Sequence, residues 1–293
     1  MQINNLFSKQ NYILKDGIYV FDKSDNYTSN FGKQWKDFQN VQIDSINNNN
    51  ISLKFLNRVL FNQISILKDK TILEIGCGAG RFTEYLVRSS RLCVSVDLSS
   101  AIFYNVSRNN KNLILVKSDL MNLDFKIKFD IVICRGVIQH TPKPKETIKK
   151  IHSFVHPNGF VFFDVYKMPK LGYFHPKYLI WRPFFKFFFT YESIKKFLIK
   201  NISWLLKVKN FVRKLFLNSY FISDVLIPIW SYEGKLELSK KMQEKWSVLD
   251  TLDGLFAKYD KPISNKNIVK LLKRNNFKVI NNDRKNNIFQ TKT

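Results

Sequence analysis

The chain has little cysteine and glycine, and it lacks long uncharged apolar runs. Its 293 residues include 3 Cys and 10 Gly. Three cysteines cannot build a disulfide framework, and an odd number favours a reducing compartment. No stretch of about 18 uncharged apolar residues is present, which argues against a membrane-spanning helix. Residues 1–5 lack the basic segment that precedes an apolar one in a secretory signal, so we expect a cytoplasmic location.

Acidic residues are also scarce. Lys and Arg total 48 against 23 Asp and Glu, which gives a formal charge of +25. Between residues 170 and 217, eleven basic residues stand against the single acid Glu192, so this stretch carries +10 of the total. The charge is therefore concentrated, and nucleic acid is not its only possible partner. With 45% hydrophobic residues the chain can still bury a sizeable core.

Short apolar runs alternate with helical patterns between residues 51 and 166. The expected strands here are 71–75, 92–97, 113–116, 129–134 and 160–165. Apolar strands that alternate with helices indicate a parallel sheet covered on both faces. The final residues 263–293 predict one more helix and a strand hairpin. We therefore expect an α/β fold, with a doubly wound, Rossmann-like, seven-stranded and mostly parallel sheet that ends in an antiparallel hairpin.

Two segments fall outside this alternation. Residues 1–50 are polar and read as an N-terminal extension to the core of 51–166. Residues 167–262 are basic, aromatic and mostly helical, and they form an insertion before the last two strands. We expect this insertion to act as a substrate lid, and we expect residues 263–293 to complete the core.

A glycine-rich turn follows the first strand of the core. The glycines are Gly76, Gly78 and Gly80, Glu74 stands two residues before them, and Asp97 ends the next strand. This order of strand, glycine turn, helix and acid is typical of a nucleotide-binding site. A carboxylate at position 74 would repel a pyrophosphate and attract an ammonium group, so the pattern favours a cationic nucleoside over a dinucleotide.

These residues belong to a longer series of motifs. The chain resembles the class I S-adenosylmethionine-dependent methyltransferases, in a bacterial branch similar to methyltransferase types 11 and 12. The matching motifs are EIGCGAGRFT at 74–83, VDLS at 96–99, SDL at 118–120, FDIV at 129–132 with GVIQHT at 136–141, and HPNGF at 156–160. The resemblance covers less than half of the chain.

The resemblance implies S-adenosyl-L-methionine as the cofactor and assigns roles to the matching residues. The three glycines would lie under the methionine part, which Glu74 would orient. Asp97 would bind the ribose hydroxyls, and Asp119 would accept a hydrogen bond from the adenine amino group. The remaining expected cofactor contacts are Arg81, Leu98, Leu120 and Arg135.

Candidates for chemistry outside the cofactor site are fewer. His140 follows the fourth strand, where this family builds its reaction face, and is the candidate base; a structural role is the alternative. Asp253 and Tyr259 are candidate substrate contacts in a segment that resembles part of the bacterial branch. The histidines and cysteines show no metal-ligand spacing, so we expect no metal. The cysteines are expected to be small core residues.

Residues 193–216 predict a basic amphipathic helix. Its apolar stripe comprises Ile194, Leu198, Ile202, Leu205, Val208, Val212 and Leu215, and its polar stripe comprises Lys196, Lys200, Ser203, Lys207, Asn210 and Lys214. Such a helix can lie on an anionic membrane or can pack on its own domain with a solvated basic face. The first alternative would place the protein peripherally at the inner membrane face.

Three functions remain open from the sequence. The leading interpretation is methyl transfer to an oxygen or nitrogen nucleophile of a small or lipid-linked molecule. An RNA methyltransferase is the second, although no Asn-Pro-Pro-Tyr motif or appended RNA module is present. The third is a non-catalytic protein on this scaffold that binds a membrane surface or nucleic acid. The acceptor, the methylated atom and the oligomeric state do not follow from the sequence.

Overall fold

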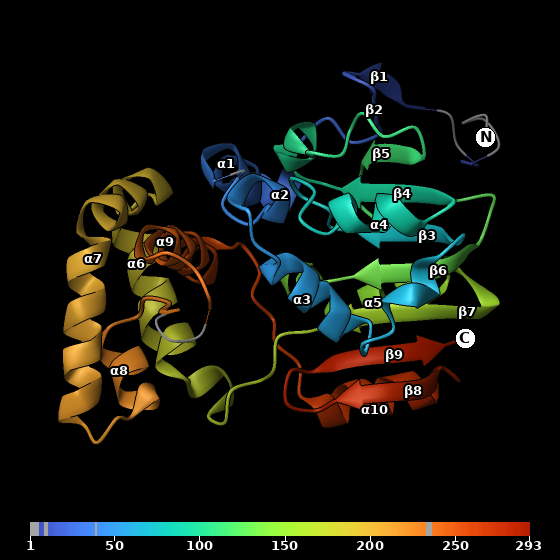
Figure 1. The fold of residues 1–293 in the computed structure, drawn as a ribbon. Coiled ribbons are helices and arrows are strands. Elements are labelled where there is room, and N and C mark those ends of the chain that lie inside the picture. Colours follow the sequence, from blue (N-terminus) through green and yellow to red (C-terminus); the bar gives the residue numbers. More distant parts are fainter. Residues whose placement is uncertain (1–5, 9–10, 39, 233–235) are drawn as a thin grey trace. The chain divides into compact units, whose positions relative to one another are not determined.

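The computed structural model describes residues 6–8, 11–38, 40–232 and 236–293. The chain divides into two compact units. The first comprises residues 1–39, 43–168 and 259–293, and the second comprises residues 40–42 and 169–258. The first unit is a sheet covered by helices, and the second is a group of helices (Figure 1).

A nine-stranded sheet forms the centre of the first unit, in the order β1-β2-β5-β4-β3-β6-β7-β9-β8. All pairs from β2 to β7 are parallel, whereas β1 with β2, β7 with β9 and β9 with β8 are antiparallel. The strands are β1 (Ile13–Lys15), β2 (Ile18–Val20), β3 (Thr71–Ile75), β4 (Leu92–Asp97), β5 (Leu113–Lys117), β6 (Phe129–Cys134), β7 (Val155–Asp164), β8 (Lys278–Asp283) and β9 (Ile288–Lys292).

The predicted doubly wound, mostly parallel sheet with its C-terminal hairpin is confirmed. The predicted count of seven strands is too low, because β1 and β2 add a short hairpin at one edge. In this hairpin β2 pairs with β5 through Ile18 and Leu115. Each of the two strands has only three residues, and the count of seven includes only the five core strands and the terminal hairpin. The sequence indicates a short strand at residues 18–21, but the predicted count does not include it as part of the sheet.

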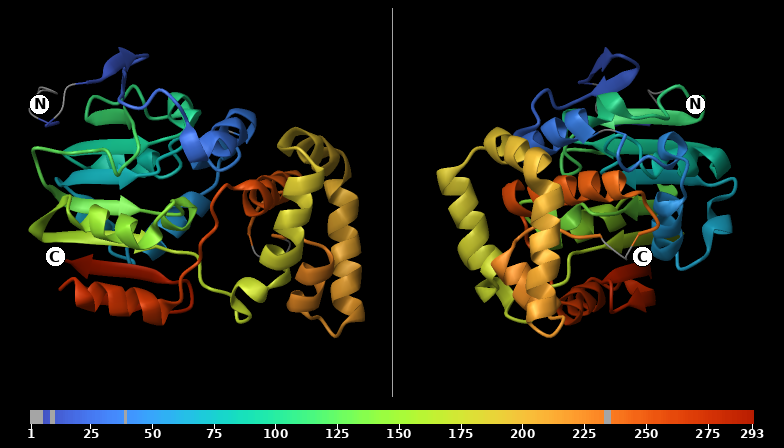
Figure 2. Two further views of the ribbon diagram at one scale, coloured as in Figure 1. Left: turned by 180° about the vertical axis from the view of Figure 1, so that it is seen from behind. Right: turned by 60° about the vertical axis from the view of Figure 1, so that its left-hand side comes forward.

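Helices cover both faces of the sheet, as the nearly continuous apolar strands require. On β3, Leu73 packs in the cluster that contains Ile148 and Ile268, whereas its neighbour Ile72 packs with Leu56 on the opposite face. Helices α5 (Pro144–His152) and α10 (Asn265–Arg274) therefore lie on one face, and α3 (Ile51–Val59) and α4 (Thr83–Ser89) on the other (Figures 1 and 2).

The first unit also contains short helices in its connections. These are η2 (Asn26–Thr28), α1 (Ser29–Phe38), α2 (Asp44–Asn47), η3 (Ile64–Leu67), η4 (Ser100–Tyr104) and η5 (Ile138–His140). The chain leaves this unit after Met168 and returns at Tyr259. The segment that leaves the unit and the segment that returns to it run side by side. The Ile263 N–H donates a hydrogen bond of 3.0 Å to Tyr166 O, and Lys167 and Ile263 form an isolated parallel β-bridge.

The second unit is helical. It contains η6 (Gly172–Phe174), η7 (Lys177–Trp181), α6 (Arg182–Phe188), α7 (Tyr191–Leu215), α8 (Tyr220–Leu226) and α9 (Lys240–Phe256). Helix α7 packs against α8 and α9, and α6 also packs against α9. The Thr190 hydroxyl accepts a hydrogen bond from the Ser193 N–H and begins α7 in a capping box.

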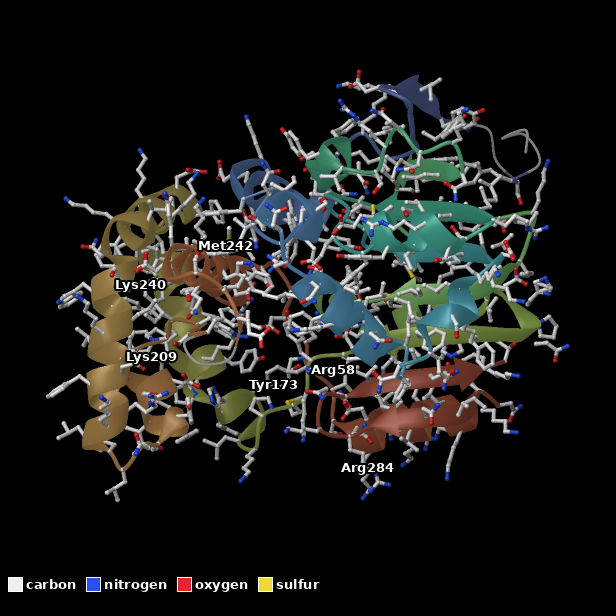
Figure 3. All side chains as sticks on the ribbon, in the orientation of Figure 1. Arg58, Tyr173, Lys209, Lys240, Met242 and Arg284 are labelled. Carbon is white, nitrogen blue, oxygen red and sulfur yellow. The ribbon has the colours of Figure 1, made fainter. Side chains whose placement is uncertain are left out.

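One side of α7 is buried within this unit. Its buried residues include Ile194, Leu198 and Ile202, together with Lys209. The Lys209 ammonium, labelled in Figure 3, lies 2.6 Å from Asp224 and also donates to the carbonyls of Ile227 and Ile229, which compensates its burial.

The predicted apolar stripe of α7 is buried only along part of the helix. Ile194, Leu198 and Ile202 are buried, whereas Leu215 at its end is 65% exposed. Within the described parts of the chain, none of the helices is both long and apolar enough to cross a membrane.

Candidate functional site

The glycine turn lies where the strand order of the sheet reverses. Strand β3 pairs with β4 on one side and with β6 on the other, and the turn at residues 76–80 follows it directly. Ligands of open α/β sheets bind at this carboxyl edge. Gly76 has a φ of +76°, and a Cβ there would lie 2.0 Å from Val137 Cγ2. A side chain at this position would thus meet both backbone strain and a clash.

Glu74 lies inside the protein at the end of β3. Its side chain is buried, and Oε2 accepts hydrogen bonds of 2.7 Å from the hydroxyls of Thr83 and Ser95. Burial raises the pKa of Glu74 to about 7, although the two hydroxyls oppose that shift. The carboxylate therefore joins β3 to β4 and to the start of α4. Its predicted part in orienting the methionine moiety of the cofactor, through a water molecule, stays a prediction.

Asp97 connects the end of β4 to the glycine turn. Its Oδ2 accepts a hydrogen bond of 2.8 Å from the Gly78 N–H, and Oδ1 accepts from both the backbone and the hydroxyl of Ser99. An ionised carboxylate has about four acceptor positions, so these three bonds leave one. Burial raises the pKa of Asp97, and its hydrogen bonds counter this. The residue can thus hold the turn and still accept one bond from a ligand.

Asp119 follows β5 and has a partner that sequence reasoning missed. The Tyr27 hydroxyl hydrogen-bonds the Asp119 carboxylate, and burial together with the charges of Asp119 and Asp97 raises the Tyr27 pKa well above its usual value. Asp119 Oδ1 also accepts from the Met121 N–H, 3.0 Å away. The Tyr27 ring lies 5.7 Å from the ring of Tyr259. No motif in the sequence marked Tyr27, which lies in the short helix η2 of the polar N-terminal extension.

Helix α1 contributes a second missed residue. The Gly78 φ is +51°, and a Cβ atom at this position would lie 3.4 Å from the Trp35 indole nitrogen. The tryptophan therefore lies beside the glycine turn. A tryptophan in a short helix is ordinarily read as a core residue, so its place at the turn could not be inferred from the sequence.

Two predicted cationic residues meet at one aromatic ring. The guanidinium carbons of Arg81 and Arg135 lie 5.0 and 5.6 Å from the centroid of the Phe55 ring. Arg135 also donates a hydrogen bond of 2.6 Å to Asp164, whose other oxygen accepts from Gly136 N. Arg135 Nε is buried without a hydrogen-bond partner among the residues that the structure describes. A buried donor of this kind is suited to an anionic ligand group.

His140 lies in η5 and is nearly inaccessible, with 6% of its surface exposed. Its Nδ1 is 2.9 Å from the carbonyl oxygen of Tyr259. Since a carbonyl can only accept, Nδ1 carries the proton, and in the neutral ring Nε2 is then the atom that can take one up. The ring centroids of Phe31 and Tyr166 lie 5.0 and 5.3 Å from the imidazole.

The remaining predicted site residues are placed as follows. Leu98 and Leu120 are buried after β4 and β5. Tyr259 belongs to the first unit and contacts the His140 and Tyr27 rings described above, whereas Asp253 lies on α9 of the second unit. Cys77, Cys93 and Cys134 are buried free thiols. Over the described ranges, no three His, Cys, Asp or Glu side chains gather as a metal site requires.

Comparison with known proteins agrees with this geometry. Residues 73–163 match the family described as "Methyltransferase domain". The chain is 29% identical over 122 residues to the ubiquinone biosynthesis O-methyltransferase of Coxiella burnetii (strain Dugway 5J108-111), covering 40% of this chain and 50% of that protein. It is 34% identical over 106 residues to the tRNA U34 carboxymethyltransferase of Campylobacter fetus subsp. fetus (strain 82-40), covering 33% and 37%.

A solved structure is also similar. PKMT2 from Rickettsia typhi, in complex with AdoHcy, matches 76% of this chain and 43% of its own with a TM-score of 0.47 and 15% identity. The chain spans about half the length, or less, of the curated relatives it matches. The sheet, the glycine turn and the matched segment together define a methyltransferase domain. This domain is of the class I S-adenosylmethionine-dependent type, as the sequence motifs predicted.

Proposed function

We propose that the protein transfers a methyl group from S-adenosylmethionine to an oxygen or nitrogen nucleophile of a small or lipid-linked molecule. The observation that carries the proposal is Asp97, which bridges the glycine turn and retains one acceptor position. A carboxylate in this position suits a ribose hydroxyl, which is a hydrogen-bond donor. The rest of the first unit supplies groups that suit the other parts of such a cofactor.

The charged groups near the turn fit a zwitterionic cofactor. Arg81 and Arg135 meet at Phe55, and the unpartnered Nε of Arg135 suits a carboxylate such as that of a methionine moiety. Asp119 would receive the adenine amino group. For this, Tyr27 must share the carboxylate or move aside, because it already donates to Asp119. Leu98 and Leu120 would contact the adenine ring.

The methyl donor supplies an electrophilic carbon on a positively charged sulfur when it is bound. The protein must align the acceptor with that carbon and exclude water, and orientation of this kind can contribute about 7–11 kcal/mol. We assign His140 as the base that takes the acceptor's proton on Nε2, because the Tyr259 carbonyl holds its Nδ1 proton. The aromatic neighbours Phe31 and Tyr166 keep the imidazole in a dry setting.

Two observations support this class of acceptor. One relative is, by its name, an O-methyltransferase of ubiquinone biosynthesis. The second unit of this chain exposes many aromatic side chains, including Phe174 at 79% and Phe187 at 83%, which suits an amphiphilic acceptor or the membrane that holds it. We further propose that residues 169–258 act as the substrate unit, with Asp253 among the groups that select the acceptor.

RNA methylation is the second candidate. It is favoured by the charge of +25 and by the similarity to a tRNA-modifying enzyme. The two proposals differ in their salt dependence, because RNA binding weakens steeply as salt rises.

Two measurements test the proposed function. Isothermal titration calorimetry with S-adenosylmethionine and with its demethylated product should show binding by the wild type and weaker binding by Asp97→Asn. Absence of binding by the folded wild-type protein would refute the cofactor assignment. Mass spectrometry of host lipids, metabolites and RNA, with and without the gene, should then show a methyl-sized mass difference in the small-molecule or lipid fraction. A difference confined to RNA would decide for the second candidate.

A further inference from the structure

Helix α7 exposes an aromatic stripe that lies away from its packed face. Phe197, Trp204 and Phe211 are 50%, 60% and 67% exposed. They are spaced by seven residues, so they lie almost in line along about 21 Å of helix. Isolated exposed apolar residues are ordinary, but a continuous aromatic row of this length marks a surface that meets a partner.

A row of lysines runs beside the aromatic stripe. Lys200, Lys207 and Lys214 repeat with the same spacing, each three residues after an aromatic residue, and all three are exposed. Positions three apart are neighbours on a helix surface. The one acid of α7, Glu192, lies at its start and pairs with Lys195 at 2.6 Å. The outer face of α7 therefore combines large apolar rings with uncompensated positive charge.

We propose that this outer face of α7 binds the surface of an anionic lipid bilayer, with the helix parallel to the membrane plane. We define the outer face as Phe197, Lys200, Trp204, Lys207, Phe211 and Lys214. Aromatic rings, tryptophan above all, are favoured at the boundary between headgroups and acyl chains. Lysine stems can lie along that boundary while their ammonium groups reach the phosphates. The proposal identifies the contacting residues and does not depend on methyl transfer.

The charge pattern favours a lipid surface over two other occupants. A second copy of the same face would bring lysine against lysine, which is repulsive. RNA would satisfy the lysines but not the apolar end of the helix, where Leu215 and Leu217 are 65% and 96% exposed. An anionic bilayer satisfies both, because its phosphates pair with the lysines and its acyl region receives the apolar side chains.

The test is co-sedimentation of the full chain with phosphatidylcholine vesicles, with and without phosphatidylglycerol, at low salt. We expect binding only when the anionic lipid is present. The triple variant Lys200→Gln, Lys207→Gln, Lys214→Gln should bind on the order of 100-fold more weakly, since each lysine near an anionic surface contributes about 1 kcal/mol. Brominated lipids should quench tryptophan fluorescence in the wild type and quench it less in Trp204→Phe.

A matched control removes the same charge elsewhere. Lys266, Lys270 and Lys273 are exposed on α10 of the first unit, and replacing all three by Gln should leave vesicle binding within about threefold of the wild type. Equal loss in both triple variants would overturn the proposal, as would no pelleting of the wild type with anionic vesicles. Binding of RNA through the α7 lysines, without vesicle binding, would assign the face to nucleic acid. Cofactor binding by the α7 variant, measured alongside, separates this failure from failure of the proposed function.

Discussion

Replacing Glu74 by glutamine isolates the effect of one buried carboxylate on stability. Glu74 is 3% exposed and accepts two hydrogen bonds from the hydroxyls of Thr83 and Ser95, and neither of these donors carries a positive charge that would offset its ionisation. Burial raises its pKa from 4.5 to about 7. The folded state therefore holds this proton more tightly than the unfolded state does, so folding is favoured where the group is protonated.

The direction and size of the pH effect follow from this shift. Below about pH 4.5 the group is protonated in both states and does not change the free energy of unfolding. As the pH rises from 4.5 to about 7 the unfolded state releases the proton first, so the free energy of unfolding falls. At about 1.4 kcal/mol per pKa unit, the penalty above pH 7 is on the order of 3 kcal/mol. Glutamine cannot ionise, so the stability of Glu74→Gln relative to the wild type should improve steadily between these pH values.

Urea denaturation at pH values from about 5 to about 8 measures this difference. The change with pH is the decisive quantity, because any loss of hydrogen bonding in the variant is nearly independent of pH. Glu146→Gln is the matched control, since the Glu146 side chain is 49% exposed on α5 and should show no comparable trend. A difference between Glu74→Gln and the wild type that stays constant over the whole range would refute the assigned cause.

Three further substitutions test other parts of the site. Asp97→Asn should weaken S-adenosylmethionine binding roughly 10- to 100-fold in calorimetry, because a hydrogen bond to a charged group is lost; unchanged affinity would exclude the ribose contact. His140→Ala should lower kcat on the order of 100-fold and change cofactor affinity little, whereas equal turnover would remove His140 as the base. Gly76→Ala should cost about 3 kcal/mol of unfolding free energy, through its φ of +76° and the contact with Val137. Adding Val137→Ala should recover part of that loss, and a neutral Gly76→Ala would contradict the clash.

The sheet of the first unit was largely predictable from the sequence. Each central strand is a short apolar run bounded by turn residues, and the runs ending at Ile75, Asp97 and Cys134 match observed strand ends. The edge hairpin was missed in the strand count because its strands have three residues each. Local patterns identify buried strands well, and they fail where an element is too short to show a period.

The candidate site was predictable only where it lies in motifs. Asp97 and the glycine turn follow from spacing, and the structure joins them by a hydrogen bond. Tyr27 and Trp35 come from the N-terminal extension, far away in sequence, and only the folded chain brings them to Asp119 and Gly78. Contacts between distant segments depend on tertiary packing, about which local periodicity carries no information.

The exposed row on α7 shows a different limit of pattern reading. The apolar period placed Ile194, Leu198 and Ile202 on one stripe, and the structure buries all three. Phe197 and Trp204, which are seven residues apart, lie on another side of the helix. The pattern predicted only one apolar and one polar stripe, so it did not identify this second apolar row. The sequence alone does not say which apolar side of such a helix packs within the same chain.

The pairing of the segments at Tyr166 and Ile263 affects how the sheet tolerates the insertion between them. Because the outgoing and returning segments are already hydrogen-bonded to each other, the loop between them is closed at its base. The entropic cost of closing a loop grows only slowly with its length, so residues inserted between these two paired segments destabilise the sheet little. An insertion such as residues 169–258 can therefore be added to a sheet of this kind at a closure cost that depends only weakly on the length of the insertion.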